Sequence, residues 1–330
     1  DLHYLMTFKT YQYFVQDTWQ ATEKLKITAG FKGLQVDIDN VYDTASTSSL
    51  AARDTSGSLQ SKDMFLPQVG LNYEVSDSIE MFASYASNMR AFTTQPFTTN
   101  RAGFQAIKDT IKPETSWTLE GGLRFDTGMF KGSIAAYHVK FKDRLLSVQP
   151  CQIVVGCASV LSNVGSITTN GLELAGTFKV TSAISLFGSY AYTDAQYDQD
   201  VLSGVLWATK GKQVVDTPKH LLNAELSYDD GNVFGRIAAN HQSKRYYTYI
   251  NDNSVGARTL VDAALGYRFG EGDTLLSGLE IQLNATNLFD KRYIATLGQN
   301  GLTFSDPGGT LQSMLVGSPQ QFFVSVRKRF

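Results

Sequence analysis

The sequence has no long apolar run and no excess of positive charge. Its most apolar stretches, such as Ile153 to Val155, are interrupted within a few positions by glycine, serine or a charged residue. A membrane-spanning helix needs roughly 20 consecutive apolar residues, so helical membrane proteins are excluded. The 29 Lys and Arg residues are balanced by 31 Asp and Glu residues, for a net charge of −2. No basic field is available for nucleic acid, and nucleic acid is not predicted as a partner.

Catalytic motifs are missing as well. The four histidines, His3, His138, His220 and His241, lie far apart in the sequence and form no HExxH pair. There is no GxSxG, no phosphate-binding loop and no GxGxxG segment. The sequence therefore predicts that the protein is not an enzyme and that it has no catalytic residues, no cofactor and no metal site.

Cysteine is scarce, with only Cys151 and Cys157 in the segment PCQIVVGCAS. In an exported protein this close spacing favours a local disulfide, which would contribute roughly 2 kcal/mol through loop closure. Two free thiols are the alternative. Metal ligation is the least favoured interpretation, because no histidine lies nearby to complete a site.

A regular alternation of apolar and polar residues runs along the chain instead. In the stretch 118–125, Leu119, Leu123 and Phe125 fall on one face, whereas Glu120 and Arg124 fall on the other. The same holds for 172–179, 222–228, 261–269 and 279–285. Transmembrane β-strands have this pattern because one face meets lipid and the other meets the lumen. Charges predicted to face the lumen are Glu120, Arg124, Glu173, Lys179, Glu225, Asp262, Arg268 and Glu280.

The connections between these strands alternate in length. Short turns are predicted near 22–24, 76–78, 127–130, 181–183, 229–232 and 270–276, and long loops near 42–63, 90–112, 144–165, 195–217, 247–256 and 295–318. An outer-membrane barrel has short periplasmic turns and long extracellular loops, whereas a soluble sandwich has no reason to place every long loop at one end. Tyrosine and phenylalanine near the strand ends, such as Tyr190 and Tyr228, fit the aromatic belts of such barrels.

The connections divide the chain into about thirteen strands, from one around Thr10 to Gln20 to a last one from Gln320 to Phe330. A closed barrel of this kind has an even number of strands, because an open edge would leave backbone groups unpaired in lipid. The sequence also begins at Asp1 without an initiator methionine or a visible targeting signal. We therefore expect the chain to be part of a longer barrel, with strands missing ahead of Asp1.

The C-terminal third resembles the TonB-dependent outer-membrane receptor family. LNATNLFDKRY (283–293) is similar to the family's NLFDxxY segment on the penultimate strand, with Asn287, Leu288, Phe289, Asp290 and Tyr293 in the matching positions. GSPQQFFVSVRKRF (317–330) resembles its last strand, which ends in Phe330. Gln320 departs from the family's usual arginine after the proline, and Lys328 stands where an aromatic residue is common. Upstream segments at 67–92, 112–126, 163–178, 188–197 and 217–228 resemble successive strand pairs of the family in its order, so the resemblance covers essentially the whole chain.

The resemblance implies that residues 1–330 are the C-terminal part of an antiparallel up-and-down transmembrane β-barrel of about 22 strands, filled by an N-terminal plug that this sequence does not contain. It further implies an outer-membrane location in a Gram-negative bacterium, surrounded by lipid. The TonB–ExbB–ExbD complex would energise it through the absent N-terminal part. The terminal Phe330 would be read by the barrel-assembly machinery.

Cargo would then bind at the extracellular loops, where Arg and Lys can pair with an anionic metal chelate and aromatic rings can stack on it. A ferric siderophore is the leading cargo by analogy with the family, and cobalamin, heme, nickel chelates or oligosaccharides are alternatives. Rivals from other classes are a self-contained porin or adhesin barrel and an outer-membrane enzyme. The candidate contacts are Arg90, Phe92, Arg101, Phe104, Arg144, Lys244, Arg245, Tyr246, Tyr247 and Tyr249.

Overall fold

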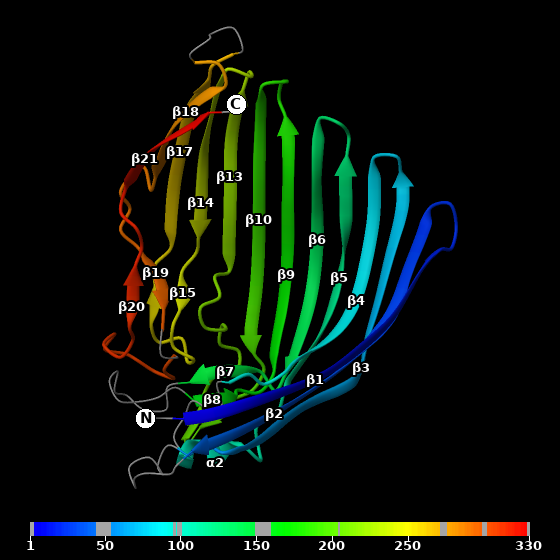
Figure 1. The fold of residues 1–330 in the computed structure, drawn as a ribbon, viewed down its shortest axis with the longest axis vertical. Coiled ribbons are helices and arrows are strands. Elements are labelled where there is room, and N and C mark those ends of the chain that lie inside the picture. Colours follow the sequence, from blue (N-terminus) through cyan, green and yellow to red (C-terminus); the bar gives the residue numbers. More distant parts are fainter. Residues whose placement is uncertain are drawn as a thin grey trace.

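Thirteen antiparallel strands form one large curved sheet in the computed structural model of the chain (Figure 1). The structure describes residues 3–43, 54–94, 97, 101–148, 160–203, 205–270, 276–298 and 302–328. The sheet strands are β1 (His3–Gln20), β2 (Leu25–Asp43), β3 (Gly57–Ser76), β4 (Ile79–Arg90), β5 (Glu114–Asp126), β6 (Phe130–Lys142), β9 (Ile167–Lys179), β10 (Ile184–Tyr197), β13 (His220–Asp229), β14 (Val233–Gln242), β17 (Arg258–Arg268), β18 (Leu279–Thr286) and β21 (Gln321–Lys328).

The strands follow one another in the sheet in sequence order, so the topology is up-and-down as predicted. The predicted short turns at 22–24, 76–78, 127–130, 181–183 and 229–232 lie at one end, at the top of Figure 1, and the described parts of the long loops lie at the other end. The long loops contain small elements that the sequence did not reveal. These are helix α2 (Arg101–Ile107) and the hairpins β7 (Leu145–Val148) with β8 (Val160–Asn163), β11 (Val201–Ser203) with β12 (Val205–Trp207), β15 (Arg245–Tyr246) with β16 (Ser254–Val255), and β19 (Ile294–Leu297) with β20 (Met314–Val316).

The predicted strand count is confirmed, but the first strands are longer than expected. β1 begins at His3 and not near Thr10, and β2 and β3 continue into the region predicted as a loop at 42–63. β2 and β3 pair as far as Asn40 with Gly57, with one register irregularity between Lys32 and Leu34. Among the described residues, no helix is long and apolar enough to cross a membrane.

The register aligns apolar residues across strands on one face of the sheet. Leu186 of β10 pairs with Leu226 of β13, which pairs in turn with Ile237 of β14. These side chains are 44%, 45% and 46% exposed, because no described part of the chain covers them. The neighbouring positions carry Ser185, Ser227 and Arg236, whose side chains point the opposite way because alternate residues of a strand face opposite sides. We call the two surfaces the apolar face and the polar face.

Aromatic residues border the apolar face near the long loops. Tyr13, Phe31 and Phe65 form a chain of rings with centroids 6.1 and 5.0 Å apart. Further along the same border, Trp117 lies 6.2 Å from Tyr85 and 5.1 Å from His138, and His220 lies between Tyr190 and Tyr192. Rings of this kind favour the boundary between lipid and water. From Ile184 to Tyr192, β10 spans about 26 Å at 3.3 Å per residue, close to the thickness of a bilayer core.

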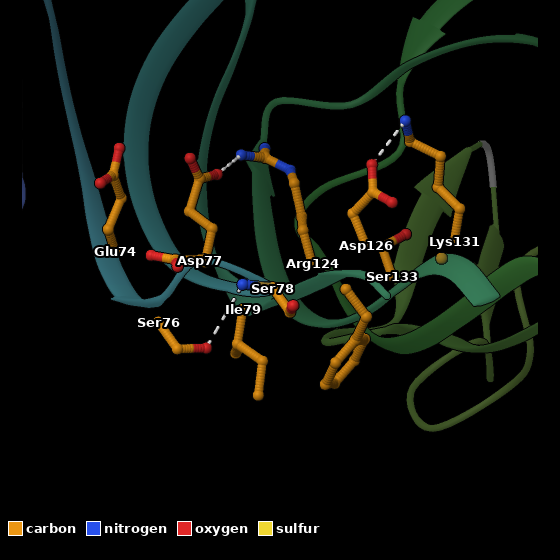
Figure 2. A pocket seen from close by; sticks show the side chains of 12 residues that line it. Glu74, Ser76, Asp77, Ser78, Ile79, Arg124, Asp126, Lys131 and Ser133 are labelled. Atoms are coloured by element: carbon orange, nitrogen blue, oxygen red, sulfur yellow. Dashed lines mark hydrogen bonds and ion pairs between the residues drawn. The ribbon is translucent and has the colours of Figure 1, made fainter. Parts of the chain in front are cut away.

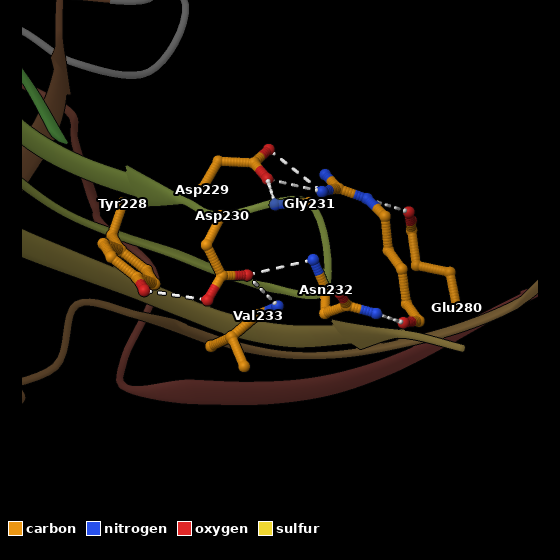
Figure 3. Close-up of polar contacts among 8 residues, drawn as sticks. Tyr228, Asp229, Asp230, Gly231, Asn232, Val233 and Glu280 are labelled. Atoms are coloured by element: carbon orange, nitrogen blue, oxygen red, sulfur yellow. Dashed lines mark hydrogen bonds and ion pairs between the residues drawn. The ribbon is translucent and has the colours of Figure 1, made fainter. Parts of the chain in front are cut away.

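At the opposite boundary, the turn at 229–232 is held by its own carboxylates (Figure 3). Oδ1 of Asp230 accepts hydrogen bonds from the backbone N–H groups of Asn232 and Val233, and Oδ2 accepts one from the Tyr228 hydroxyl at 2.8 Å. Gly231 has φ +99°, which a residue with a side chain rarely adopts. On the polar face, Arg268 bridges Asp229 at 2.7 Å and Glu280 at 3.0 Å. The tight turn and the ion pairs fix the register of β13, β14, β17 and β18 at this end.

Candidate ligand-binding vestibule

Beyond the aromatic border, the two faces of the strands exchange their character. On β2 and β3, the polar face of the membrane region continues toward the long loops. There it carries Val36, Ile38, Leu59 and the hydroxyl residue Ser61, all of them buried. The other side carries Gln35, Asp37, Gln60 and Lys62, in the same strands and the same register. Between the membrane boundary and the long loops, the continuation of the polar face, which we call the inward side, is therefore apolar. The loops fold against it.

Two buried clusters hold the loops on this inward side. The first, the α2 cluster, joins the upper ends of β2 and β3 to Phe92, Phe97 and Phe104 and to β7 and β8. The second, the Tyr249 cluster, joins Tyr197 of β10 to Tyr249, Phe304 and Trp207, with ring centroids 4.9 to 6.0 Å apart. Packing of this kind orders the loops on the polar side of the sheet. We call the region formed by these packed loops and the adjoining strand ends the vestibule.

The aromatic residues predicted to stack on cargo are mostly part of these walls. Phe92 is 4% exposed, Phe104 0%, Tyr247 2% and Tyr249 1%. Burial raises the pKa of the Tyr249 hydroxyl well above its ordinary value, so that this phenol stays neutral. Tyr246 is half-buried and lies 4.9 Å below the Lys244 ammonium. In this conformation the buried rings support the loops from inside, and stacking on a ligand would require them to move.

Two of the predicted arginines converge on one buried carboxylate. Glu114 begins β5 and its side chain is 5% exposed. It pairs with Arg144, accepts a hydrogen bond from the backbone N–H of Leu145 at 2.8 Å, and lies 3.8 Å from Arg90. The Arg144 guanidinium also lies 4.7 Å from the centre of the Phe141 ring. Two cations share one anion here, so the group carries a net positive charge.

Arg90 is the more accessible of the two cations. Its side chain is 49% exposed, against 26% for Arg144, and it donates to the carbonyl of Leu145 at 3.1 Å. Two positions before it in β4, on the same face, Asn88 receives a hydrogen bond from the Lys32 ammonium at 2.9 Å. Lys32, Arg90 and Arg144 therefore place three cations on the polar side of β2–β6 where the vestibule begins. Neither Lys32 nor Glu114 was predicted as a site residue from the sequence.

The remaining predicted residues are placed apart from this group. Arg101 is exposed at the start of α2. Arg245 is buried, pairs with Asp216 at 2.6 Å and donates to the backbone carbonyl of Ile294 at 3.1 Å, so it ties loops together. Cys151 and Cys157 lie outside the described residues, as does Phe330.

The resemblance predicted that the segment 287–293 belongs to the penultimate strand, but it forms the turn that follows β18. Asn287, at φ +49°, donates through its side-chain amide to the carbonyls of Lys291 and Ser318 at 3.0 Å. Asp290 accepts from the backbone N–H of Gln320 at 3.1 Å. Gln320, which replaces the arginine usual in the family, donates to the carbonyl of Leu288 at 2.7 Å. The motif thus joins the end of β18 to the start of β21.

At the short-turn end, β3 to β6 border a hollow of 740 Å³ (Figure 2). Glu80 pairs with Arg124, whose guanidinium lies 4.2 Å from the Phe82 ring, and Asp126 pairs with Lys131 at 2.8 Å. No group of three His, Cys, Asp or Glu residues able to hold a metal ion occurs within the described ranges. The polar face therefore offers charged and hydrogen-bonding groups from the vestibule to the opposite rim, which suits a passage for a polar solute.

An up-and-down sheet with an apolar belt outside and a polar wall inside is the architecture of an outer-membrane β-barrel. A family model described as TonB dependent receptor-like, beta-barrel, matches residues 4–288. The chain belongs to the TonB-dependent receptor family.

Curated relatives and solved structures agree with this assignment. The chain is 26% identical over 288 residues to the ferrioxamine B receptor of Salmonella typhimurium, covering 84% of this chain and 37% of the relative. It is 26% identical over 276 residues to the ferric-pyoverdine M114 receptor PbuA of Pseudomonas sp. strain M114, covering 80% and 29%. The siderophore receptor PiuA of Acinetobacter baumannii superposes with a TM-score of 0.75 at 18% identity over 98% of this chain and 43% of that one, which shows a common fold. The chain thus spans less than half the length of these relatives.

Proposed function

We propose that this chain forms the C-terminal part of the barrel of a TonB-dependent importer, and that its vestibule captures an anionic ferric siderophore. The observation that carries the proposal is the cationic group of Lys32, Arg90 and Arg144. Arg90 and Arg144 share the buried carboxylate of Glu114, and Lys32 donates to Asn88, two positions before Arg90. Ferric chelates with net negative charge are attracted to such a group, and Arg can donate two parallel hydrogen bonds to a carboxylate or similar oxygen pair. Relatives named as ferrioxamine B and ferric-pyoverdine receptors support a ferric siderophore as the cargo. Its negative charge is proposed from the cationic group alone.

The parity of the sheet supports the proposal that the barrel is longer than this chain. With 13 antiparallel strands, the edge strands β1 and β21 run in the same direction. They cannot pair antiparallel with each other, so closure needs an odd number of further strands. A barrel of about 22 strands, the size of the plugged outer-membrane transporters, meets this requirement.

Two lumen carboxylates support the proposal of a plug. Glu120 and Glu173 lie on the polar face in the middle of β5 and β9, and in the part of the chain that the structure describes neither makes an ion pair or side-chain hydrogen bond. A carboxylate in the lumen is stabilised by a cationic partner. A plug carrying Arg or Lys would supply that partner, and TonB would act through it; the proposed role includes no enzymatic step.

The test is uptake by the full-length protein in cells grown under iron limitation. We expect ferric siderophore to bind to these cells and to accumulate in them. When TonB is deleted, accumulation should stop while binding at the cell surface persists. Arg90→Gln should weaken binding by about tenfold, because it removes one accessible cation while Glu114 keeps Arg144 and the Leu145 N–H.

Lys108→Gln is the matched control, since Lys108 pairs with the exposed Asp109 and not with Glu114. Accumulation that continues without TonB would point to a porin and overturn the importer proposal. Binding of a neutral or cationic cargo such as cobalamin, with no effect of Arg90→Gln, would overturn the cargo class.

A further inference from the structure

The two halves of the polar face differ in how their charged side chains are paired. Glu120 of β5 and Glu173 and Lys179 of β9 lie on this face, and within the described ranges none of them makes an ion pair. Glu120 and Glu173 lie near the middle of their strands. We call the polar face of β5, β6 and β9 the carboxylate wall. Its unpaired groups leave it open to a partner of opposite charge.

The other half of the polar face carries a row of neutral amides. The register places Ser189 of β10 opposite Asn223 of β13, and Asn223 opposite Asn240 of β14. Asn240 Nδ2 donates to Asn223 Oδ1 at 2.5 Å, and Asn223 Nδ2 donates to Ser189 Oγ at 3.0 Å. Gln282 and Asn284 of β18 form a further amide pair at 2.6 Å. We call the polar face of β10, β13, β14, β17, β18 and β21 the amide wall.

Every charged side chain that the structure describes on the amide wall has a partner. In β10 the polar face carries no charged residue between Ser185 and Thr193. In the other five strands, four carboxylates are balanced by four guanidinium groups, and the contacts are Glu225 with Arg236, Asp229 and Glu280 with Arg268, Glu280 with Arg327, Asp262 with the backbone N–H of Asn287, and Arg258 with Gln242. The amide wall therefore needs no partner from outside the barrel.

This difference determines where a plug is held. A plug cation opposite Glu120 or Glu173 forms an ion pair shielded from water, and separating such a pair leaves a charge without its partner. On the amide wall the described charges already have partners within the barrel, so withdrawing the plug breaks no ion pair of this kind. A gap between plug and barrel therefore opens more easily along the amide wall.

The chemistry of the amide wall suits a moving anion. A side-chain amide has two N–H donors, and Asn223 and Asn240 each use one of them in the row, which leaves one N–H free to donate to an anionic oxygen. Passage requires contacts that are strong enough to admit a solute and weak enough to release it. Unpaired carboxylates would repel an anionic chelate, and unpaired cations would retain it. Neutral amides do neither.

We propose that the amide wall is the surface along which the ferric chelate crosses the membrane, while the carboxylate wall keeps hold of the plug. This inference rests on the importer function proposed above. The chelate reaches the wall from the cationic group of the vestibule, because Arg144 follows β6 and only β9 separates β6 from β10 in the sheet. Its oxygens accept hydrogen bonds from Asn240 and Asn223 in the middle of the barrel.

The first experiment compares one alanine on each wall, Ala238 of β14 and Ala175 of β9. Full-length proteins with Ala238→Cys or Ala175→Cys, in a parent carrying Cys151→Ser and Cys157→Ser, are expressed in cells that take up ferric chelate, and their reaction with a maleimide is timed. We expect TonB to raise the reaction rate at position 238 by about fivefold and to change the rate at position 175 by less than about twofold, because the rate follows the fraction of time that the gap is open.

The second experiment adds charge to each wall. Asn223→Asp with Asn240→Asp keeps the shape of both side chains but places two carboxylates on the amide wall. Accumulation of the anionic chelate should fall by about tenfold while its binding at the cell surface is unchanged, because like charges repel. Ala175→Asp with Thr177→Asp adds two carboxylates to the carboxylate wall and is the matched control, which should accumulate the chelate like the parent.

Three results would overturn the proposed path. They are a reaction rate at position 238 that does not respond to TonB, a rate at position 175 that rises as much, and parent-like accumulation by the variant with both asparagines changed. Each leaves the importer function intact, since the parent still accumulates the chelate. A parent that binds the chelate but never accumulates it would instead remove the importer function, and this inference with it.

Discussion

The same strands behave differently in the membrane and above it. In the membrane region of β9 and β10, Leu174 and Leu186 face outward, and Glu173 and Ser185 face inward. Above the aromatic border of β10, Asp194 faces outward, whereas Ala195 and Tyr197 face inward and are buried. The alternation of side chains continues unchanged along the strand, but the surroundings of each face change at the membrane boundary. The comparison shows that the surroundings of a strand, and not its period, decide which row of side chains forms a core.

The reversal also explains the position of the predicted ligand-binding aromatics. In the membrane region the inward side of the sheet carries polar side chains, so the described residues form no hydrophobic core there. Above the boundary the loops return to the inward side and bury Phe104 and Tyr249. Cations at the base of the loops, such as Arg90, remain accessible. The accessible chemistry of the vestibule is therefore more ionic than the sequence indicated.

The largest effect is expected from breaking the loop packing alone. Phe104→Ala removes a ring that is 0% exposed and lies 4.9 Å from the Phe97 ring, and should cost about 3–5 kcal/mol of local stability. Limited proteolysis should then cut the segment around α2, while the sheet keeps its resistance. Phe289→Ala, at a side chain that is 74% exposed, is the control and should change little. Cooperative loss of the whole sheet would contradict the separation of the two regions.

A charge placed on each face of one strand tests whether the apolar face meets lipid and the polar face meets the lumen. Leu174→Arg puts a guanidinium against lipid and should cost about 2–4 kcal/mol, whereas Ala175→Arg points into the lumen and should cost far less. Folding into lipid vesicles across a denaturant series measures both. Similar losses for the two variants would mean that the apolar face is not the lipid face.

A smaller effect is expected at the carboxylate between the arginines. Glu114→Gln leaves Arg90 and Arg144 without an anion and weakens the hydrogen bond from the Leu145 N–H. Bonds to charged groups contribute about 1.5–3 kcal/mol each, so the hairpin of β7 and β8 should exchange its amide protons faster. Glu120→Gln on the same strand is the control, and unchanged exchange in Glu114→Gln would remove the anchoring role.

The smallest effect is expected at the opposite end, in the turn after β13. Hydrogen bonds from the Tyr228 hydroxyl and from the N–H groups of Val233 and Asn232 hold the pKa of Asp230 below its ordinary value. Because the folded-state pKa is lowered, this contribution is present above the ordinary aspartate pKa of about 3.9 and is lost as pH falls through the folded pKa. Asp230→Asn should slightly reduce the loss of unfolding free energy as the pH falls, which a plot of unfolding free energy against pH measures. An unchanged profile would mean that another carboxylate controls it.

The alternation along the strands was sufficient to predict the strand number, the short turns and the inward direction of Glu120 and Glu173. Each of these follows from a local pattern. The small hairpins and α2 were not predicted, because short elements in loops are stabilised by contacts with distant residues, such as Phe104 with the ends of β2 and β3. Glu114 was overlooked for the same reason, since its two arginine partners lie 24 and 30 positions away in the chain.

The sequence by itself determined the amphipathic strands and their order, because a side chain's face depends only on whether its position is odd or even. Which segments above the membrane became buried was decided only by the tertiary structure. There, contacts between loops set the burial of Tyr197 and Tyr249 and left Arg90 open. The physical reason is that burial in the loops depends on contacts between residues distant in the sequence, whereas the alternation of faces along a strand depends only on adjacent residues.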